Sequence, residues 1–141
     1  MSGARYTVEN LKGCLVEARV ERLTTAAEAD AYAADVADAA QRCGPPQTAV
    51  LCADHRSANI YPPEVADRLL LAFRPNNTRF ERIAILVAKD NATLLMQLQR
   101  LTREAGSDRR RVFLEPGGAL EHLAKSLDAG ELERARQFLG G

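Results

Sequence analysis

TAVLCADHRSANIYPPEVADRLLLAF, residues Thr48 to Phe73, is the stretch that decides the fold. The predicted strand covers residues 48–53. After Thr48 it is an unbroken apolar run, which is typical of a strand covered on both faces. The polar residues from Asp54 to Tyr61 predict a turn. Pro62 and Pro63 suit the first turn of a helix, because the N–H group that proline lacks would have no partner within the helix there. The stretch therefore predicts a buried strand, a turn and a helix.

The residues on either side alternate between strand and helix patterns. Strands alternating with helices predict an α/β fold with a mostly parallel sheet. We expect one domain over residues 1–141, with four to five strands, an N-terminal hairpin and four to five helices. The helix that opens at the prolines is expected to end at Arg74-Pro75-Asn76-Asn77. The other predicted strands cover residues 5–10, 13–20, 80–88 and 110–114, and the other helices cover residues 25–43, 92–105, 118–127 and 129–139.

The second predicted strand, residues 13–20, alternates in polarity. Val16 and Ala18 point to one side, while Glu17 and Arg19 point to the other. Successive side chains of a strand face opposite ways, so the pattern predicts that one face of this strand meets the core.

The charge balance limits the classes of partner. The chain has 19 Lys and Arg and 19 Asp and Glu, a formal net charge of zero at pH 7. This balance gives no electrostatic reason to expect nucleic acid as a partner. The longest apolar runs, Leu69 to Phe73 and Ile83 to Ala88, are too short to span a bilayer, and the first residues lack a secretion-signal pattern. We therefore expect a cytoplasmic protein with no membrane insertion.

The three cysteines, Cys14, Cys43 and Cys52, are widely spaced and lie in apolar surroundings. They form no CxxC pair and no Cys/His spacing that is typical of zinc sites. We expect buried, reduced thiols, with no metal and no cofactor.

Three segments carry a family resemblance: AVLCADHRSANIYPPEVADRLL, RFERIAILVAKDNATLLMQLQRL and RRVFLEPGGALEHL. With the predicted order of elements, they resemble a STAS domain, the fold shared by sulfate-transporter cytoplasmic domains and anti-sigma-factor antagonists. The chain is most similar to small SpoIIAA-like bacterial proteins, and the resemblance covers most of residues 48–127. It implies a single STAS-like domain over residues 1–141.

In the antagonist branch, a kinase-like partner phosphorylates a hydroxyl residue in an Asp-Ser-Ser/Thr-Gly turn and docks on the helix that follows. Matching Asp54 to the aspartate of that family places the turn on Pro62-Pro63-Glu64-Val65. Glu64 thus stands where the phosphorylated residue is expected, and it cannot receive a phosphate. Either the domain is a constantly phospho-like docking module, or the switch is foreign to it. Ser57 is a candidate for a displaced acceptor.

The resemblance implies that the helix after the prolines binds a protein. Glu64, Arg68 and Leu71 share its polar face, so Leu71 is expected to be exposed. Tyr61 either joins the rim of this surface or staples the turn to the core, and Met96 is a weaker candidate on another helix. The expected partner is a regulatory kinase, a signalling complex or a second copy of the chain, which would make a homodimer.

A second candidate surface follows from the topology. Ligands of open parallel sheets bind beyond the carboxyl ends of the strands. There, a small-molecule or anion sensor is the alternative function, and an enzyme using His55 and Asp90 is a third. No nucleophile elbow, phosphate loop or HExxH motif is present, so the leading prediction is a non-enzymatic interaction module. The residues predicted for this cleft are Asp54, Arg56, Ser57, Lys89 and Asn91.

Overall fold

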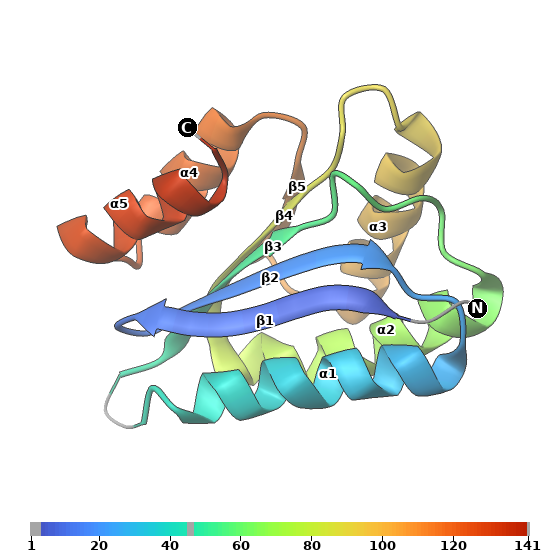
Figure 1. Cartoon of the computed structure of the whole chain (residues 1–141), viewed down its shortest axis with the longest axis horizontal. Helices are drawn as coiled ribbons and strands as arrows, with labels where there is room; N and C mark the ends of the chain where they lie inside the picture. The colour runs from blue at the N-terminus through green and yellow to red at the C-terminus, as the bar shows by residue number, and fades with distance from the viewer. Residues whose placement is uncertain (1–3, 45–46, 141) are drawn as a thin grey trace.

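The computed structural model describes residues 4–44 and 47–140. Within these ranges, five strands form one sheet in the order β1-β2-β3-β4-β5 (Figure 1). β1 and β2 form an antiparallel hairpin, and the other neighbours are parallel, which confirms the predicted α/β class. The strands are β1 (Arg5–Lys12), β2 (Leu15–Arg22), β3 (Ala49–Asp54), β4 (Phe80–Leu86) and β5 (Arg110–Phe113), and the helices are α1 (Ala26–Gln41), α2 (Pro63–Arg79), α3 (Ala92–Ala105), α4 (Pro116–Ala124) and α5 (Ala129–Phe138).

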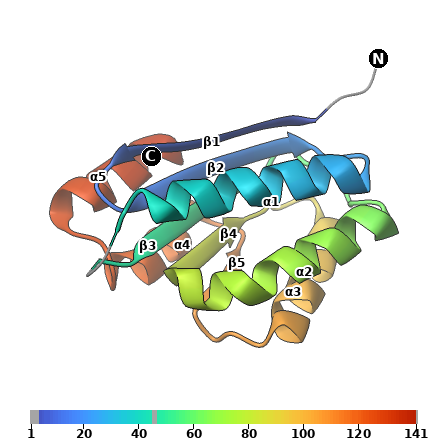
Figure 2. The same cartoon turned by 90° about the horizontal axis from the view of Figure 1, so that it is seen from below.

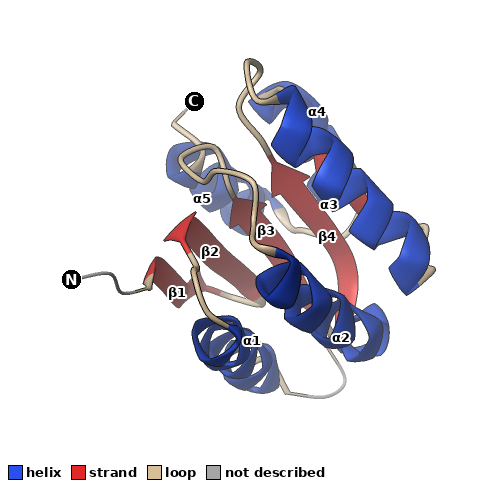
Figure 3. Cartoon of the chain, turned by 90° about the vertical axis from the view of Figure 1, so that its right-hand side faces the viewer, coloured by secondary structure: helices blue, strands red, loops and turns tan. Residues whose placement is uncertain are grey.

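The strand order decides where the helices lie. From β2 to β5 the strands follow one another across the sheet, and one helix joins each pair. Right-handed crossovers that always step in the same direction place their helices on the same face. Accordingly, α1, α2 and α3 cover one face, with α1 and α2 side by side (Figure 2). The C-terminal helices α4 and α5 cover the other face (Figure 1 and Figure 3).

Strand β3 contributes to both cores, as its unbroken apolar run predicts. Leu51 and Ala53 belong to the core beneath α1, α2 and α3, whereas Val50 and Cys52 belong to the core beneath α4 and α5. All six residues of β3 are buried. The strand is therefore the layer against which the two sets of helices pack.

Strand β2 differs from the prediction that only one of its faces meets the core. Leu15 is buried in the second core, and Glu17, on the same face, is 1% exposed. Arg134 of α5 donates two hydrogen bonds to the Glu17 carboxylate, both at 2.7 Å. The polar residue is thus paired beneath a helix and is not solvated, because a buried carboxylate needs a partner.

Helix α2 continues past the end predicted at residues 74–77 and stops at Arg79. Pro75 lies inside it and removes one helical N–H, which would normally end or kink the helix. Beyond the proline, the Asn77 side chain donates to the end of α3 at 2.7 Å and accepts from Arg110 of β5 at 2.8 Å. These tertiary hydrogen bonds hold the last turn, and the sequence around the proline does not reveal them.

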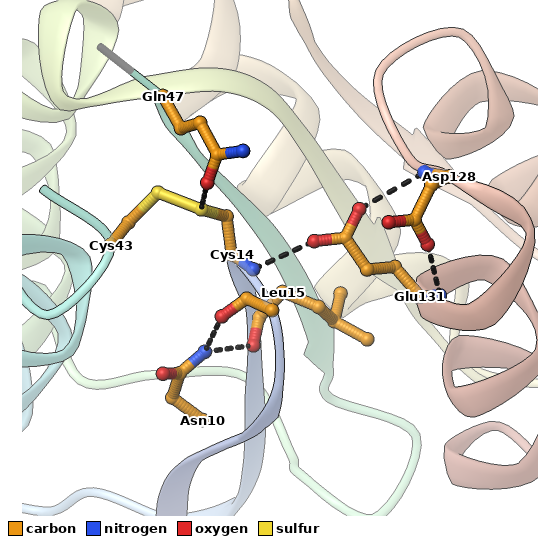
Figure 4. Close-up of a disulfide and its surroundings, with 8 residues drawn as sticks. Asn10, Cys14, Leu15, Cys43, Gln47, Asp128 and Glu131 are labelled. Carbon is orange, nitrogen blue, oxygen red and sulfur yellow. Dashed lines mark hydrogen bonds between the residues drawn. A yellow bond between two sulfur atoms is a disulfide. The ribbon is translucent and has the colours of Figure 1, made fainter. Parts of the chain in front are cut away.

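A disulfide joins Cys14, in the turn between β1 and β2, to Cys43, just after α1 (Figure 4). The two cysteines are 29 residues apart in the chain, and their Cα atoms are 5.0 Å apart. The prediction of reduced thiols is wrong for this pair and is confirmed for Cys52, which is free and buried. The pairing depends on α1 returning to the hairpin turn, which the spacing of the cysteines does not show.

The hairpin turn beside the disulfide also holds the start of α5 (Figure 4). The Cys14 N–H donates to the Glu131 carboxylate at 2.7 Å, and Glu131 forms a capping box with Asp128. Gly13 has a φ of 57°, and a Cβ at this position would collide with the Glu131 carboxylate. Glycine is therefore required there for both its backbone conformation and the close approach of α5.

Because the disulfide closes a long loop, we expect its reduction to lower the free energy of unfolding by about 2–4 kcal/mol. Urea denaturation with and without dithiothreitol measures this difference. The Cys14→Ser, Cys43→Ser variant is the control, and its midpoint should not respond to the reductant. Alkylation of the denatured, unreduced protein should label one thiol, that of Cys52. Equal midpoints for the oxidised and reduced protein would show that the bond contributes nothing to stability.

Candidate functional site

The outer face of α2 carries three of the residues predicted to bind a partner. Glu64, Arg68 and Leu71 are all exposed, and Leu71 exposes 53% of its surface. The expectation that Leu71 points away from the core is confirmed. Arg68 forms a salt bridge at 3.8 Å with Asp30 of the neighbouring α1. The face presents a carboxylate at its N-terminal end, a guanidinium in the middle and an apolar side chain beyond it.

Pro75 changes the backbone of the same face. In a regular helix the N–H of residue 75 would donate to the carbonyl of Leu71, and proline has no N–H. Leu71 therefore combines an exposed apolar side chain with a carbonyl that lacks its helical donor.

Tyr61, the fourth residue predicted for this surface, lies inside the molecule. Its side chain is 4% exposed, and its hydroxyl is 2.6 Å from Nδ1 of His55. The two rings meet edge to face, with centroids 5.9 Å apart. Tyr61 therefore staples the turn to the core, which is the second of the two roles that the sequence allowed, and is not part of the exposed face.

Helix α3 fixes the turn that leads into α2. Gln97 accepts from the N–H of Tyr61 at 2.8 Å and donates to its carbonyl at 2.9 Å. Asn91 donates to the carbonyl of Ala58 at 3.2 Å and also caps α3 by accepting from the N–H of Leu94 at 3.1 Å. These four bonds hold the turn before α2 in one conformation.

At the strand ends, the Asp54 carboxylate is fully engaged by the protein itself. It is 4% exposed, and Arg56 binds it with two side-chain hydrogen bonds of 3.0 Å and one backbone N–H at 3.0 Å. Arg19 of β2 adds a further bond at 3.2 Å. Together these donors hold the pKa of Asp54 below its ordinary value, against the effect of burial, which raises it.

The same two arginines also hold the end of α5. Arg19 donates to the carbonyl of Phe138 at 2.6 Å and lies 4.4 Å from the centre of its ring. Arg56 donates to the carbonyl of Leu139 at 3.0 Å. The last carbonyls of a helix lack partners within it and favour positive charge. Asp54 therefore works through Arg19 and Arg56 as a structural link between the sheet and α5.

The remaining cleft candidates do not surround one open site with free polar groups. Lys89 forms a salt bridge at 2.6 Å with Glu115, and both side chains are exposed. Asn91 is the cap of α3, and Ser57 is exposed in the turn. The ligand cleft stays a prediction, and four of its five residues, Asp54, Arg56, Lys89 and Asn91, are already bonded within the protein.

His55 is buried and neutral, and does not line an open cleft. It is 3% exposed, and burial lowers its pKa from 6.5 to about 4. Burial raises the pKa of Tyr61 well above its ordinary value, so the hydroxyl that is hydrogen-bonded to Nδ1 of His55 stays protonated. Burial also raises the pKa of Cys52 to about 12, which keeps this thiol protonated and unreactive.

Sequence reasoning missed the residues that act through pairing across the fold. Arg19 lies beside Asp54 because β2 and β3 pair in register at these residues, and no local pattern reveals that register. Gln97 reaches the turn only because α3 packs beside α2. The one available signal was Asp54 itself, a carboxylate at the end of a buried strand, which predicts a partner of positive charge.

No protein-family model, no curated protein and no solved structure matches this chain. Within residues 4–44 and 47–140, no group of three or more His, Cys, Asp or Glu side chains is placed to hold a metal ion. A functional proposal for this chain therefore rests on its own fold and surfaces.

Replacing Asp54 with Asn should lower the free energy of unfolding by about 2–3 kcal/mol, because it removes a charged acceptor shared by two arginines. The loss stays below that of a fully buried ion pair, since both arginines are partly exposed. Glu115→Gln, which breaks the exposed Lys89 pair, is the control and should cost less than about 1 kcal/mol. Urea unfolding measures both, and an unchanged midpoint for Asp54→Asn would contradict the structural role.

The buried, neutral His55 makes stability depend on pH. Its pKa falls from 6.5 in the unfolded chain to about 4 in the fold, so the unfolded state binds more protons between these values. The contribution is fully present above pH 6.5 and is lost as the pH falls towards 4, at up to about 1.4 kcal/mol per pH unit. His55→Asn should flatten the slope of unfolding free energy in this window, and identical slopes would contradict the burial of a neutral ring.

Proposed function

We propose that this chain is a non-enzymatic, STAS-like protein–protein interaction module of bacterial regulation or signalling. It docks through the outer face of α2 and the turn before it. The observation that carries the proposal is the exposure of Leu71, 53% of its surface, on the same face as Glu64 and Arg68. The mixed sheet with an N-terminal hairpin supports the STAS resemblance at the level of the fold.

Glu64 supplies a permanent charge in this proposal. It is exposed in the first turn of α2, where negative charge is favoured by the helix dipole. In the resembled antagonists, this position would carry the phosphorylated hydroxyl. The glutamate would keep the docking surface in one charge state, so binding would need no phosphorylation.

The partner would be a regulatory kinase, a signalling complex or a second copy of the chain. The chemistry of the face limits what the surface of that partner can be. Such a partner would offer an apolar pocket for Leu71, a donor for the Leu71 carbonyl, whose helical donor Pro75 removes, and a basic group near Glu64. Hydrogen bonds from Gln97 and Asn91 already fix the turn that leads into α2. Apolar anchors on a rigid element are the usual centres of binding energy in protein interfaces.

We place the module in the cytoplasm. No helix within the described residues is long and apolar enough to cross a membrane. Disulfides are rare in reducing compartments such as the cytoplasm. In the cytoplasm, Cys14 and Cys43 would be kept as thiols or would alternate between thiols and the disulfide. The docking face includes neither cysteine, so the proposed interaction holds in either redox state.

The test is the recovery of binding partners by the tagged full chain carrying Glu64→Lys and Leu71→Asp. Reversing the charge and placing a carboxylate on the apolar anchor should abolish recovery, a loss of at least about tenfold. Sedimentation velocity of the same proteins tests the case in which the partner is a second copy.

Met96→Asp is the matched control, because Met96 is an apolar side chain on α3 with 69% of its surface exposed. This variant should bind as the wild type does, and circular dichroism should show that all variants are folded. Unchanged partner recovery by the folded Glu64→Lys, Leu71→Asp variant would remove the α2 face from consideration.

A further inference from the structure

A second surface lies on the opposite layer of the molecule, between the edge strand β5 and helix α4. It contains a surface pocket of about 200 Å³. An open pocket of this size has room for a small anion or for the head of a larger ligand. The pocket is lined by Arg111, Phe113, Gly118, Glu121, His122 and Lys125.

The pocket carries positive charge that the protein does not neutralise. Arg111 and Lys125 are exposed, and neither forms a salt bridge within the described part of the chain. Arg82 of β4 lies close enough to act on the His122 ring in the wall of the pocket, and it donates to a hydroxyl on the loop after α4 at 3.0 Å. Glu121 is the one carboxylate in the lining. Within the lining, Arg111 and Lys125 therefore face a single carboxylate.

His122 forms the wall of the pocket. It is 5% exposed, and its ring lies beside that of Phe113, with centroids 5.5 Å apart. Its Nε2 is 2.9 Å from the carbonyl of Arg109, which can only accept, so Nε2 carries a proton. Nδ1 is then the atom that gains a proton when the ring becomes charged.

Protection of the sheet edge explains only part of this cluster. β5 is the last strand of the sheet, and charged residues on an edge strand discourage pairing with another chain. That role accounts for Arg111. It does not account for Lys125, which is the C-cap of α4, or for Arg82, which is on the inner strand β4.

We propose that this pocket binds a phosphate-class oxyanion, either as a free ion or as the phosphate group of a small molecule, through Arg111 and Lys125. The planar fork of arginine suits two oxygens of such an anion, and lysine adds a point charge. The pocket and the α2 face lie on opposite sides of the sheet, so this site is independent of the proposed docking function.

The two histidines of the chain provide a direct readout. Burial, together with Arg82, Arg111 and Lys125, lowers the pKa of His122, while its bond to the Arg109 carbonyl raises it. A bound dianion would offset the three cations and raise this pKa again. His55 is buried on the other side of the sheet and serves as an internal reference.

The experiment is a histidine NMR titration of the full chain from about pH 5 to about pH 8, in sodium chloride and in sodium sulfate at equal ionic strength. Sulfate keeps its charge across this range, so only the protein titrates. We expect sulfate to raise the His122 midpoint by about half a unit or more and to leave unchanged the signal of His55, which stays neutral over most of this range. Inorganic phosphate and a small phosphate monoester, each at fixed pH, then distinguish the free ion from a phosphorylated ligand by affinity.

The Arg111→Gln, Lys125→Gln variant should bind sulfate at least about tenfold more weakly. Arg74→Gln with Arg103→Gln is the matched control, since it removes two exposed arginines from the other layer and changes the net charge equally. If sulfate leaves the His122 midpoint unchanged, or if both variants lose affinity equally, the site is refuted. Partner recovery through α2 should not change in the pocket variant, so failure of either proposal can be told from failure of the other.

Discussion

The sheet has two apolar faces, and the strand-to-strand connections cover only one of them. Helices α1, α2 and α3 lie on the same face because every crossover steps in the same direction. The second face would expose Leu15 and Val50 to water without α4 and α5, which follow the last strand. Polar bonds fasten α5 there: Arg134 to Glu17, the Cys14 N–H to Glu131, and two arginines held by Asp54.

The hydrogen bonds that hold α5 on the sheet also determine which surfaces remain free to bind a ligand or a protein. The strand ends, where an open parallel sheet usually receives its ligand, are occupied in this chain by the Asp54 cluster and the end of α5. Two surfaces are not used in this way. The outer face of α2 exposes Leu71 beside charged residues, and the pocket between β5 and α4 holds Arg111 and Lys125, which form no salt bridge within the described residues. They lie on opposite layers, so the sheet would separate the proposed docking face from the proposed anion site.

Much of the architecture could be predicted, because burial and periodicity are local properties. The apolar run of β3 required cover on both faces. The helical spacing of Glu64, Arg68 and Leu71 placed Leu71 on the outer face of α2. Pairings between distant residues could not be predicted. The alternating polarity of β2 predicts that only one face of the strand meets the core, yet Arg134, more than a hundred residues later, pairs with Glu17 on the other face. The disulfide of Cys14 likewise requires α1 to end beside the hairpin.

Hydrophobic pattern and helix or strand geometry are enough to fix the kinds and order of the elements, the mostly parallel sheet and the outward direction of Leu71. The burial of Tyr61 against His55, the continuation of α2 past Pro75 and the pairing of the Asp54 carboxylate with arginines follow only from the packing of the folded chain. Such features depend on which polar groups meet across elements, and a buried polar group takes whichever partner the packing brings within reach.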